Sequence, residues 1–368
     1  MRTLQLALVL VGLAACHVES PINLQDPGEG TRYDSCDLNI DFLIVATARD
    51  GVQALDDARW VDVSEAEVPG YLNPDTRVIG VQTFGQSYAI PLNLLWYHEI
   101  VNLSPGGPLG PQIAITYCPL TGSSLVFDRT AIGGARLGVS GLLFMNNLVL
   151  FDRSTGESLW PQMLAEARCG VQTGTRLGQH PFVEMQWSEW LSLHPDTRVL
   201  DGDQGYDPIR FDYLLYPYGV YRETEAFWRA ATTMPPLDRR RFSKERVVGV
   251  PSSTAGQTIA FPFGALTDLD GTYQAVDFAL EGAPALVLWS DDAQGGYAYR
   301  PETEDGTPVT LLSTTSGFED VETGSTWTVE GEAVAGPMAG ARLVALERTH
   351  TAFWGAWAAF NPDTRLWE

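Results

Sequence analysis

The sequence is poor in basic residues. Its 368 residues include 23 lysines and arginines against 46 aspartates and glutamates, so the formal net charge is −23. A chain with this balance repels polyanions, because like charges would face one another across the contact. We therefore expect no nucleic-acid partner and no attachment to anionic lipid through a basic face.

Several short catalytic motifs are also missing. The sequence contains no glycine-rich phosphate loop, no dinucleotide-binding fingerprint and no His-Glu-x-x-His zinc motif. Ser123-Ser124 lacks the Gly-x-Ser-x-Gly context of a hydrolase nucleophile, and only five histidines are available as a general base. These absences argue against the common nucleotide-dependent enzymes, zinc proteases and serine hydrolases.

Long apolar runs are absent except for one near the N-terminus. Arg2 precedes an apolar run over residues 4–13, and Ala14, Ala15 and Cys16 follow it. A basic residue, a short apolar segment and small residues before a cleavage site are typical of a secretory signal. The run is too short for a membrane-spanning helix of about 20 residues.

The end of this segment predicts a lipid anchor. Leu-Ala-Ala-Cys at residues 13–16 resembles a bacterial lipoprotein signal, in which the cysteine is lipidated and becomes the first residue. We expect a signal peptide over residues 1–15, lipidation of Cys16 and a polar tether over 16–50. The predicted location is the bacterial cell envelope, facing the periplasm or the surface, with the membrane as a partner through the lipid.

The chain contains an internal repeat. Pro91 and Pro262 are 171 residues apart, as are Arg129 and Arg300. At an offset of 167, Trp187-Ser-Glu-Trp190 matches Trp354-Gly-Ala-Trp357, and His194-Pro-Asp-Thr-Arg198 matches Asn361-Pro-Asp-Thr-Arg365.

Two reactive side chains occur in the first copy alone. His98 aligns with Leu269, and Cys118 aligns with Trp289. The matched proline, arginine and tryptophan residues occur in both copies, whereas this histidine and this cysteine occur in the first copy alone. The asymmetry therefore ranks His98 and Cys118 as candidate site residues.

Cysteine is scarce, with four residues in the chain. If Cys16 is acylated, three thiols remain, and in an oxidising compartment they allow one disulfide in three possible pairings. Cys169 aligns with Ala335 of the second copy, and Cys36 precedes the repeat. We expect a disulfide between Cys36 and Cys169, with Cys118 as the free thiol.

The local patterns favour short strands. Strands are expected over 77–90 (two, around a glycine turn), 113–118, 142–152 and 246–250, and helices over 91–101, 184–193, 223–231 and 350–360. The predicted fold class is α+β and β-dominated, with two similar β-rich lobes from an internal duplication, each with a few short helices. The first lobe spans 51–200 and holds the candidate site, a tyrosine-rich connection spans 201–243, and a decayed second lobe spans 244–368.

The candidate site combines three residue types. Cys118 ends a strand and precedes Pro119, at a turn of the kind that often presents functional side chains. His98 lies beside the apolar stripe of the helix at 91–101, and Glu99 lies on it, with Arg129 or Arg153 as possible ion-pair partners. Met145 is a possible soft metal ligand. The alternatives are a buried structural thiol, a hydrogen-bonded core histidine and a core methionine.

Several spaced motifs resemble one bacterial family, the domain of unknown function 3179. They are Trp96–Asn102, Thr116–Ser123, Ser140–Leu143, Phe151–Arg153, Leu159–Gln162, His194–Leu200 and Lys244–Val250. The resemblance covers about residues 51–250, continues weakly to the C-terminus and implies no particular activity. Relatives often carry Cys-Pro-Leu-Cys where this chain has Cys118-Pro-Leu-Thr121. The missing second cysteine argues against thioredoxin-like exchange.

Three classes of function remain open. The leading hypothesis is a cell-envelope binding or scaffold protein with a small-molecule or protein partner. The second is a metal-handling module in which Cys118, His98 and Met145 bind copper, because soft ligands suit Cu(I). The third is a thiol enzyme with Cys118 as nucleophile, His98 as base and Glu99 orienting the histidine.

Overall fold

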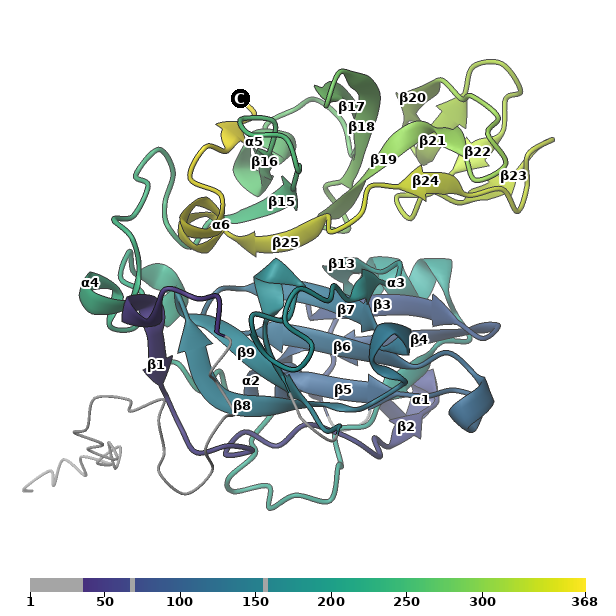
Figure 1. Ribbon diagram of the computed structural model, residues 1–368. Helices are drawn as coiled ribbons and strands as arrows, with labels where there is room; N and C mark the ends of the chain where they lie inside the picture. Colours follow the sequence, from purple (N-terminus) through teal and green to yellow (C-terminus); the bar gives the residue numbers. More distant parts are fainter. Residues whose placement is uncertain (1–35, 67–69, 155–157) are drawn as a thin grey trace, which may run out of the picture.

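The computed structural model describes residues 36–66, 70–154 and 158–368. The predicted signal peptide, Cys16 and most of the predicted tether lie outside these residues. None of the described helices is long and apolar enough to cross a membrane. As predicted, the chain is dominated by strands with a few short helices, which form two lobes in Figure 1.

Three sheets build the first lobe. One has the order β1-β8-β9-β10-β11, with β1 Leu43–Val45, β8 Leu137–Phe144, β9 Asn147–Asp152, β10 Ser158–Pro161 and β11 Cys169–Gly170. The next has the order β12-β7-β6-β5, with β12 Gly178–Gln179, β7 Ser123–Asp128, β6 Ile113–Cys118 and β5 Ile100–Leu103. The third has the order β13-β3-β4-β14-β2, with β13 Val183–Gln186, β3 Arg77–Thr83, β4 Gln86–Pro91, β14 Arg198–Leu200 and β2 Trp60–Val61.

Three further sheets build the second lobe, which lies above the first in Figure 1. One has the order β25-β15-β16-β26, with β25 His350–Phe353, β15 Arg246–Val250, β16 Ile259–Pro262 and β26 Arg365–Leu366. The next has the order β17-β18-β19-β24, with β17 Tyr273–Leu280, β18 Ala283–Ser290, β19 Gly295–Thr303 and β24 Leu343–Ala345. The last has the order β20-β21-β22-β23, with β20 Leu311–Thr314, β21 Gly317–Asp320, β22 Thr326–Trp327 and β23 Ala333–Ala335.

The helices are short and connect these sheets. The α-helices are α1 Val63–Ala66, α2 Leu92–His98, α3 Trp187–Leu193, α4 Ala230–Thr233, α5 Phe263–Thr267 and α6 Trp354–Phe360. The 3-10 helices are η1 Ile40–Phe42, η2 Gly107–Leu109, η3 Thr130–Ile132, η4 Gln162–Leu164 and η5 Tyr221–Glu223.

Two predicted helices need correction. The helix expected over 91–101 ends at His98, because Glu99 adopts the left-handed conformation (φ 59°) and the β-branched Ile100 begins β5. The expected helix over 223–231 is wrong, since only η5 and α4 flank this region. The two tryptophan helices begin later than expected, after the strands β13 and β25.

Each lobe has a buried tryptophan pressed against a glycine. A Cβ atom at Gly80 would lie 2.1 Å from the Trp190 ring, and one at Gly249 would lie 2.2 Å from the Trp357 ring. Each indole N–H also donates to a threonine hydroxyl at 3.0 Å. A side chain larger than hydrogen would displace these rings from the strands that they cover.

The tyrosine-rich connection packs on both lobes. Tyr221 donates its hydroxyl to the carbonyl of Leu120 in the first lobe at 2.7 Å. Arg240 donates to the carbonyl of Thr364 in the second lobe at 3.1 Å. These contacts place the connection over the junction of the lobes.

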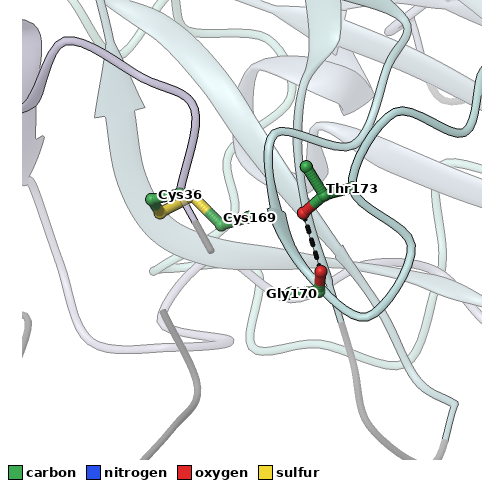
Figure 2. Close-up of a disulfide and its surroundings, with 4 residues drawn as sticks. All are labelled: Cys36, Cys169, Gly170 and Thr173. Carbon is green, nitrogen blue, oxygen red and sulfur yellow. Dashed lines mark hydrogen bonds between the residues drawn. A yellow bond between two sulfur atoms is a disulfide. The ribbon is translucent and has the colours of Figure 1, made fainter. Parts of the chain in front are cut away.

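A disulfide joins Cys36 to Cys169, which is the pair expected from the sequence (Figure 2). Cys169 lies on β11, and the backbone N–H of Asp37 donates to the carbonyl of Arg168 beside it. Close to the bridge, the Thr173 hydroxyl donates to the carbonyl of Gly170 at 2.7 Å. The bridge therefore connects the first described residues to the edge of the β1–β11 sheet.

Candidate functional site

Cys118 is a fully buried thiol. The backbone N–H of Leu148 donates to its Sγ at 3.3 Å, and Sγ lies 3.6 Å from the carbonyl of Asn146. Burial, followed by the negative charge of Glu99, raises the pKa of the thiol to about 11. Little thiolate therefore forms near neutral pH, and the thiolate is the reactive species.

The turn after Cys118, which is expected from the sequence to present functional side chains, is covered by the second lobe. The backbone N–H of Phe353, on β25 of the second lobe, donates to the carbonyl of Thr121 at 2.8 Å. Gly122 has a φ of 59°, and a Cβ atom there would lie 2.7 Å from the Phe353 ring. The second lobe therefore closes the turn off from solvent.

Buried polar side chains complete the surroundings of this turn. Thr121, where relatives often carry cysteine, shares a 2.8 Å hydrogen bond with Ser123. Asn147 donates to both hydroxyls and to Gln162, and Ser123 donates to Gln162 at 2.6 Å. These groups satisfy one another, which is typical of a structural network.

His98 does not contact Cys118 within the described residues. Its Nδ1 lies 2.9 Å from the carbonyl of Gln53, and its Nε2 lies 2.6 Å from the Tyr213 hydroxyl. A carbonyl only accepts, so Nδ1 carries the proton and Nε2 accepts from Tyr213. Burial lowers the pKa of His98 to about 4, despite the bond to Gln53. The neutral ring is therefore held by protein partners, and the predicted pairing of base and thiol is not formed.

Glu99 has neither of the expected ion-pair partners. Arg129 donates to Gly134 and Ser104, and Arg153 pairs with Asp50. The carboxyl group of Glu99 is buried, and burial raises its pKa from 4.5 to about 8. Glu99 is therefore a neutral acid over much of the pH range, not an orienting carboxylate for His98.

The copper hypothesis finds no assembled ligand set. Over residues 36–66, 70–154 and 158–368, no group of three or more histidine, cysteine, aspartate or glutamate side chains could hold a metal ion. Met145 packs against the core cluster that contains Cys118, but the nitrogens of His98 are engaged elsewhere. The three predicted ligands are therefore not brought together.

A cleft of about 270 Å³ opens between α2 and the tyrosine-rich connection. We call it the arginine cleft and define it by six of its lining residues: Arg77, Arg222, Arg246, Asn93, Trp96 and Tyr213. Both lobes contribute, since Arg77 lies on β3 and Arg246 on β15. Asp75 also lines it, so the cleft carries more positive than negative side chains in an acidic protein.

The three guanidinium groups of the cleft differ in how closely a carboxylate lies to each of them. Arg77 pairs with Glu184 at 2.6 Å, and Arg246 lies 3.9 Å from the same carboxylate oxygen. Arg222 stacks 3.6 Å above the Tyr216 ring, and no carboxylate of the described residues lies within 4.0 Å of it. The cleft therefore has one guanidinium group whose charge is not compensated.

Two buried polar atoms in the wall of the cleft have no hydrogen-bond partner among the described residues. They are the indole Nε1 of Trp96 and the Oδ1 of Asn93, whose Nδ2 donates to the carbonyls of Tyr71 and Tyr213. A buried polar atom without a partner is destabilising by about 1–3 kcal/mol.

Sequence reasoning missed the arginine cleft. Arg222 and Arg246 lie far from α2 in the chain, and only the fold brings them together. One signal was available, because Asn93 is a polar residue between Leu92 and Leu94 on a largely apolar helix. A polar residue at such a position needs a partner or a function.

Comparisons with known proteins give one match. A family model described as "Protein of unknown function (DUF3179)" matches residues 49–364. No curated protein and no solved structure matches. The match covers both lobes and includes Asn93, Cys118, Arg222 and Arg246.

Proposed function

Because this chain belongs to the DUF3179 family of proteins of unknown function, we propose a function from its geometry: an exported, lipid-anchored protein that binds a small carboxylate in the arginine cleft. The observation that carries the proposal is that Trp96 Nε1 and Asn93 Oδ1 have no hydrogen-bond partner and the Arg222 charge has no carboxylate partner among the described residues, and that all three residues line one cleft. Ligand sites typically combine apolar walls with a few convergent polar groups.

The chemistry of the cleft selects the ligand. A guanidinium group binds a carboxylate through two parallel hydrogen bonds, and burial strengthens these bonds. Trp96 offers a further donor, whereas Asn93 offers an acceptor. The preferred ligand is therefore a small carboxylate that also carries a hydroxyl or amino group. The stacked Tyr216 ring holds Arg222 in place and lowers the entropy lost on binding.

Replacing Arg222 by alanine is expected to weaken binding of such a carboxylate about 10- to 150-fold, because a charge-assisted hydrogen bond contributes about 1.5–3 kcal/mol. Titration calorimetry with lactate, alanine and succinate measures this change. Arg222→Lys keeps the charge without the planar fork and should restore binding only in part. Arg210→Ala is the control, because Arg210 is exposed in the same connection and does not line the cleft. Equal affinities of the Arg222→Ala and Arg210→Ala proteins would reject the site.

Export and anchoring are part of the proposal. The disulfide between Cys36 and Cys169 supports an oxidising compartment, since disulfides rarely persist in a reducing cytosol. The signal-like segment before Cys16 supports lipidation. The tether would then hold the cleft away from the membrane.

The anchor has a direct test. The wild-type protein is expected to enter the detergent phase after Triton X-114 separation, whereas Cys16→Ser protein stays in the aqueous phase or keeps its signal peptide. Ser20→Ala is the matched control, because it alters the same segment without removing the thiol that is acylated. Normal processing and membrane attachment of the Cys16→Ser protein would contradict lipidation.

We also infer that the two lobes arose by duplication. Matching sheet orders support this, since β13-β3-β4-β14 corresponds to β25-β15-β16-β26, and β12-β7-β6-β5 corresponds to β24-β19-β18-β17. The isolated bridge Glu166–Arg176 has a counterpart in Glu332–Arg342, and the glycine–tryptophan contacts recur. A crystal structure in which the lobes had different strand orders would contradict the duplication.

A further inference from the structure

A second pocket, of about 480 Å³, lies where the two lobes face one another. Ser87 on β4 and Glu330, from the turn between β22 and β23, both line it. His194 follows α3 and lies between them: its Nδ1 is 3.1 Å from Ser87 Oγ, and its Nε2 is 2.7 Å from Glu330 Oε2. We propose that Ser87, His194 and Glu330 form a nucleophile–base–carboxylate triad that hydrolyses small carboxylic esters.

The hydrogen bonds set the direction of proton transfer. A carboxylate only accepts, so Nε2 of His194 carries a hydrogen and donates it to Glu330. In the neutral ring Nδ1 is then the acceptor, and the Ser87 hydroxyl donates to it. This is the arrangement that a serine needs to lose its proton as it attacks. In chymotrypsin-like triads Nε2 faces the serine and Nδ1 faces the carboxylate, whereas here Nδ1 faces Ser87 and Nε2 faces Glu330. In both arrangements the histidine takes the proton of the serine and the carboxylate stabilises the imidazolium.

Neighbouring groups hold the imidazole in this orientation. The backbone N–H of His194 donates to the backbone carbonyl of Trp190 at 2.8 Å. The centroids of the His194 imidazole and the Trp190 indole lie 4.1 Å apart. The other oxygen of Glu330 accepts from Gln82 Nε2 at 3.1 Å. The side chains of His194 and Glu330 are 13% and 9% exposed, so water competes little for their bond. A triad depends on this kind of fixed geometry.

The pocket beside the triad has room and surfaces for a substrate. Aromatic side chains line it, namely Phe84, Phe182, Tyr297 and Tyr299, and Gln82 and Arg342 add polar groups. Glu330 comes from the second lobe, whereas Ser87 and His194 come from the first. The triad therefore exists only when the lobes are together.

The second lobe gives an internal comparison that rests on the proposed duplication. At the offsets of the repeat, Thr258 corresponds to Ser87 and Asn361 corresponds to His194. The Asn361 side chain donates to the carbonyl of Trp357. Thr258 keeps a hydroxyl group, but an amide cannot act as a general base, so the base occurs in one copy only, as with His98 and Cys118.

The reaction balances with water as the only co-reactant. Ser87 Oγ bonds to the ester carbonyl carbon while its proton passes to His194 Nδ1. The C–O bond to the alcohol then breaks, and the same proton passes to the departing alcohol oxygen. Water attacks the acyl-serine, gives a proton to His194 and releases the carboxylic acid as Ser87 recovers its hydrogen. Glu330 accepts the hydrogen bond from His194 Nε2 throughout and stabilises the imidazolium.

A fluorophosphonate probe tests the proposal on the full-length protein. Wild-type protein is expected to react with one equivalent, and peptide mapping should place the adduct on Ser87. Ser87→Ala should abolish labelling and hydrolysis of p-nitrophenyl acetate. His194→Asn, which installs the residue of the second copy, should lower the rate about 10²- to 10⁴-fold, the usual contribution of a general base. Glu330 acts through His194, so Glu330→Gln should lower kcat and leave KM nearly unchanged.

A control variant shows whether the labelling is specific to Ser87. Ser316→Ala removes an exposed serine of the second lobe and should leave labelling unchanged. Absence of labelling in the wild type, or labelling that persists in Ser87→Ala, would overturn the triad even if His194→Asn fails to fold.

Discussion

Replacing Cys36 and Cys169 together by alanine is expected to lower the free energy of unfolding by about 5 kcal/mol. The bridge closes a loop of 133 residues, and chain-entropy theory gives a stabilisation of about that size for such a loop. The loss should concentrate in the first lobe, because the bridge attaches residue 36 to β11 at the edge of its β1–β11 sheet. Urea denaturation followed by circular dichroism measures it.

Reductant supplies the matched control for this prediction. Dithiothreitol should lower the stability of wild-type protein toward that of the Cys36→Ala/Cys169→Ala variant and leave the variant unchanged. Cys118 is not part of the bridge and is present in both proteins. If the variant and the wild type unfold at the same urea concentration without reductant, the loop constraint does not contribute to stability.

The Glu99→Gln protein is expected to gain stability relative to the wild type as the pH rises. Between pH 4.5 and 8 the difference in their free energies of unfolding should grow by up to about 5 kcal/mol. Burial raises the pKa of the Glu99 carboxyl to about 8 in the folded protein. Across this window the folded state keeps a proton that the unfolded state has lost. By linkage the stability of the wild type then falls with rising pH. Glutamine is uncharged at every pH and avoids this fall.

Two buried histidines act in the opposite direction but cancel in the comparison. Burial lowers the pKa of His98 and of His350 to about 4, so both groups favour folding as the pH rises toward 6.5. They are unchanged between the two proteins. Glu65→Gln, an exposed residue in α1, serves as the control and should show no pH-dependent gain. A stability difference for Glu99→Gln that stays constant from pH 4.5 to 8.5 would contradict the buried neutral acid.

The sequence was least able to predict which side chains meet. Cys118 and His98 are the two reactive residues that the repeat singles out, yet each has other partners. The helix that carries His98 is expected from the sequence to continue to residue 101. A left-handed residue at Glu99 instead ends α2 and turns the chain into β5. A single backbone conformation of this kind is decided by burial and sheet pairing, which composition does not reveal.

The sequence does contain a signal for His194. At the offset of the proposed repeat this residue corresponds to Asn361, which is the same asymmetry that draws attention to His98. The partners of His194 have no such signal, because Ser87 and Glu330 belong to no local motif and are 243 residues apart in the chain. Ser123 and Ser124, which follow a glycine, are both buried. The proximity of Ser87 and Glu330 depends on how the two lobes pack.

The sequence alone determined the strand-rich composition, the family and the tryptophan helices, because these depend on local residue patterns with a period or a spacing. It also predicted Cys36–Cys169, since the repeat marked both residues as additions to the framework. Tertiary structure decided the rest. The second lobe buries the Cys118 turn through Phe353, the connection brings Arg222 to Arg246, and Glu330 reaches His194 across the lobes. Such contacts join distant parts of the chain, and the packing of whole sheets determines them.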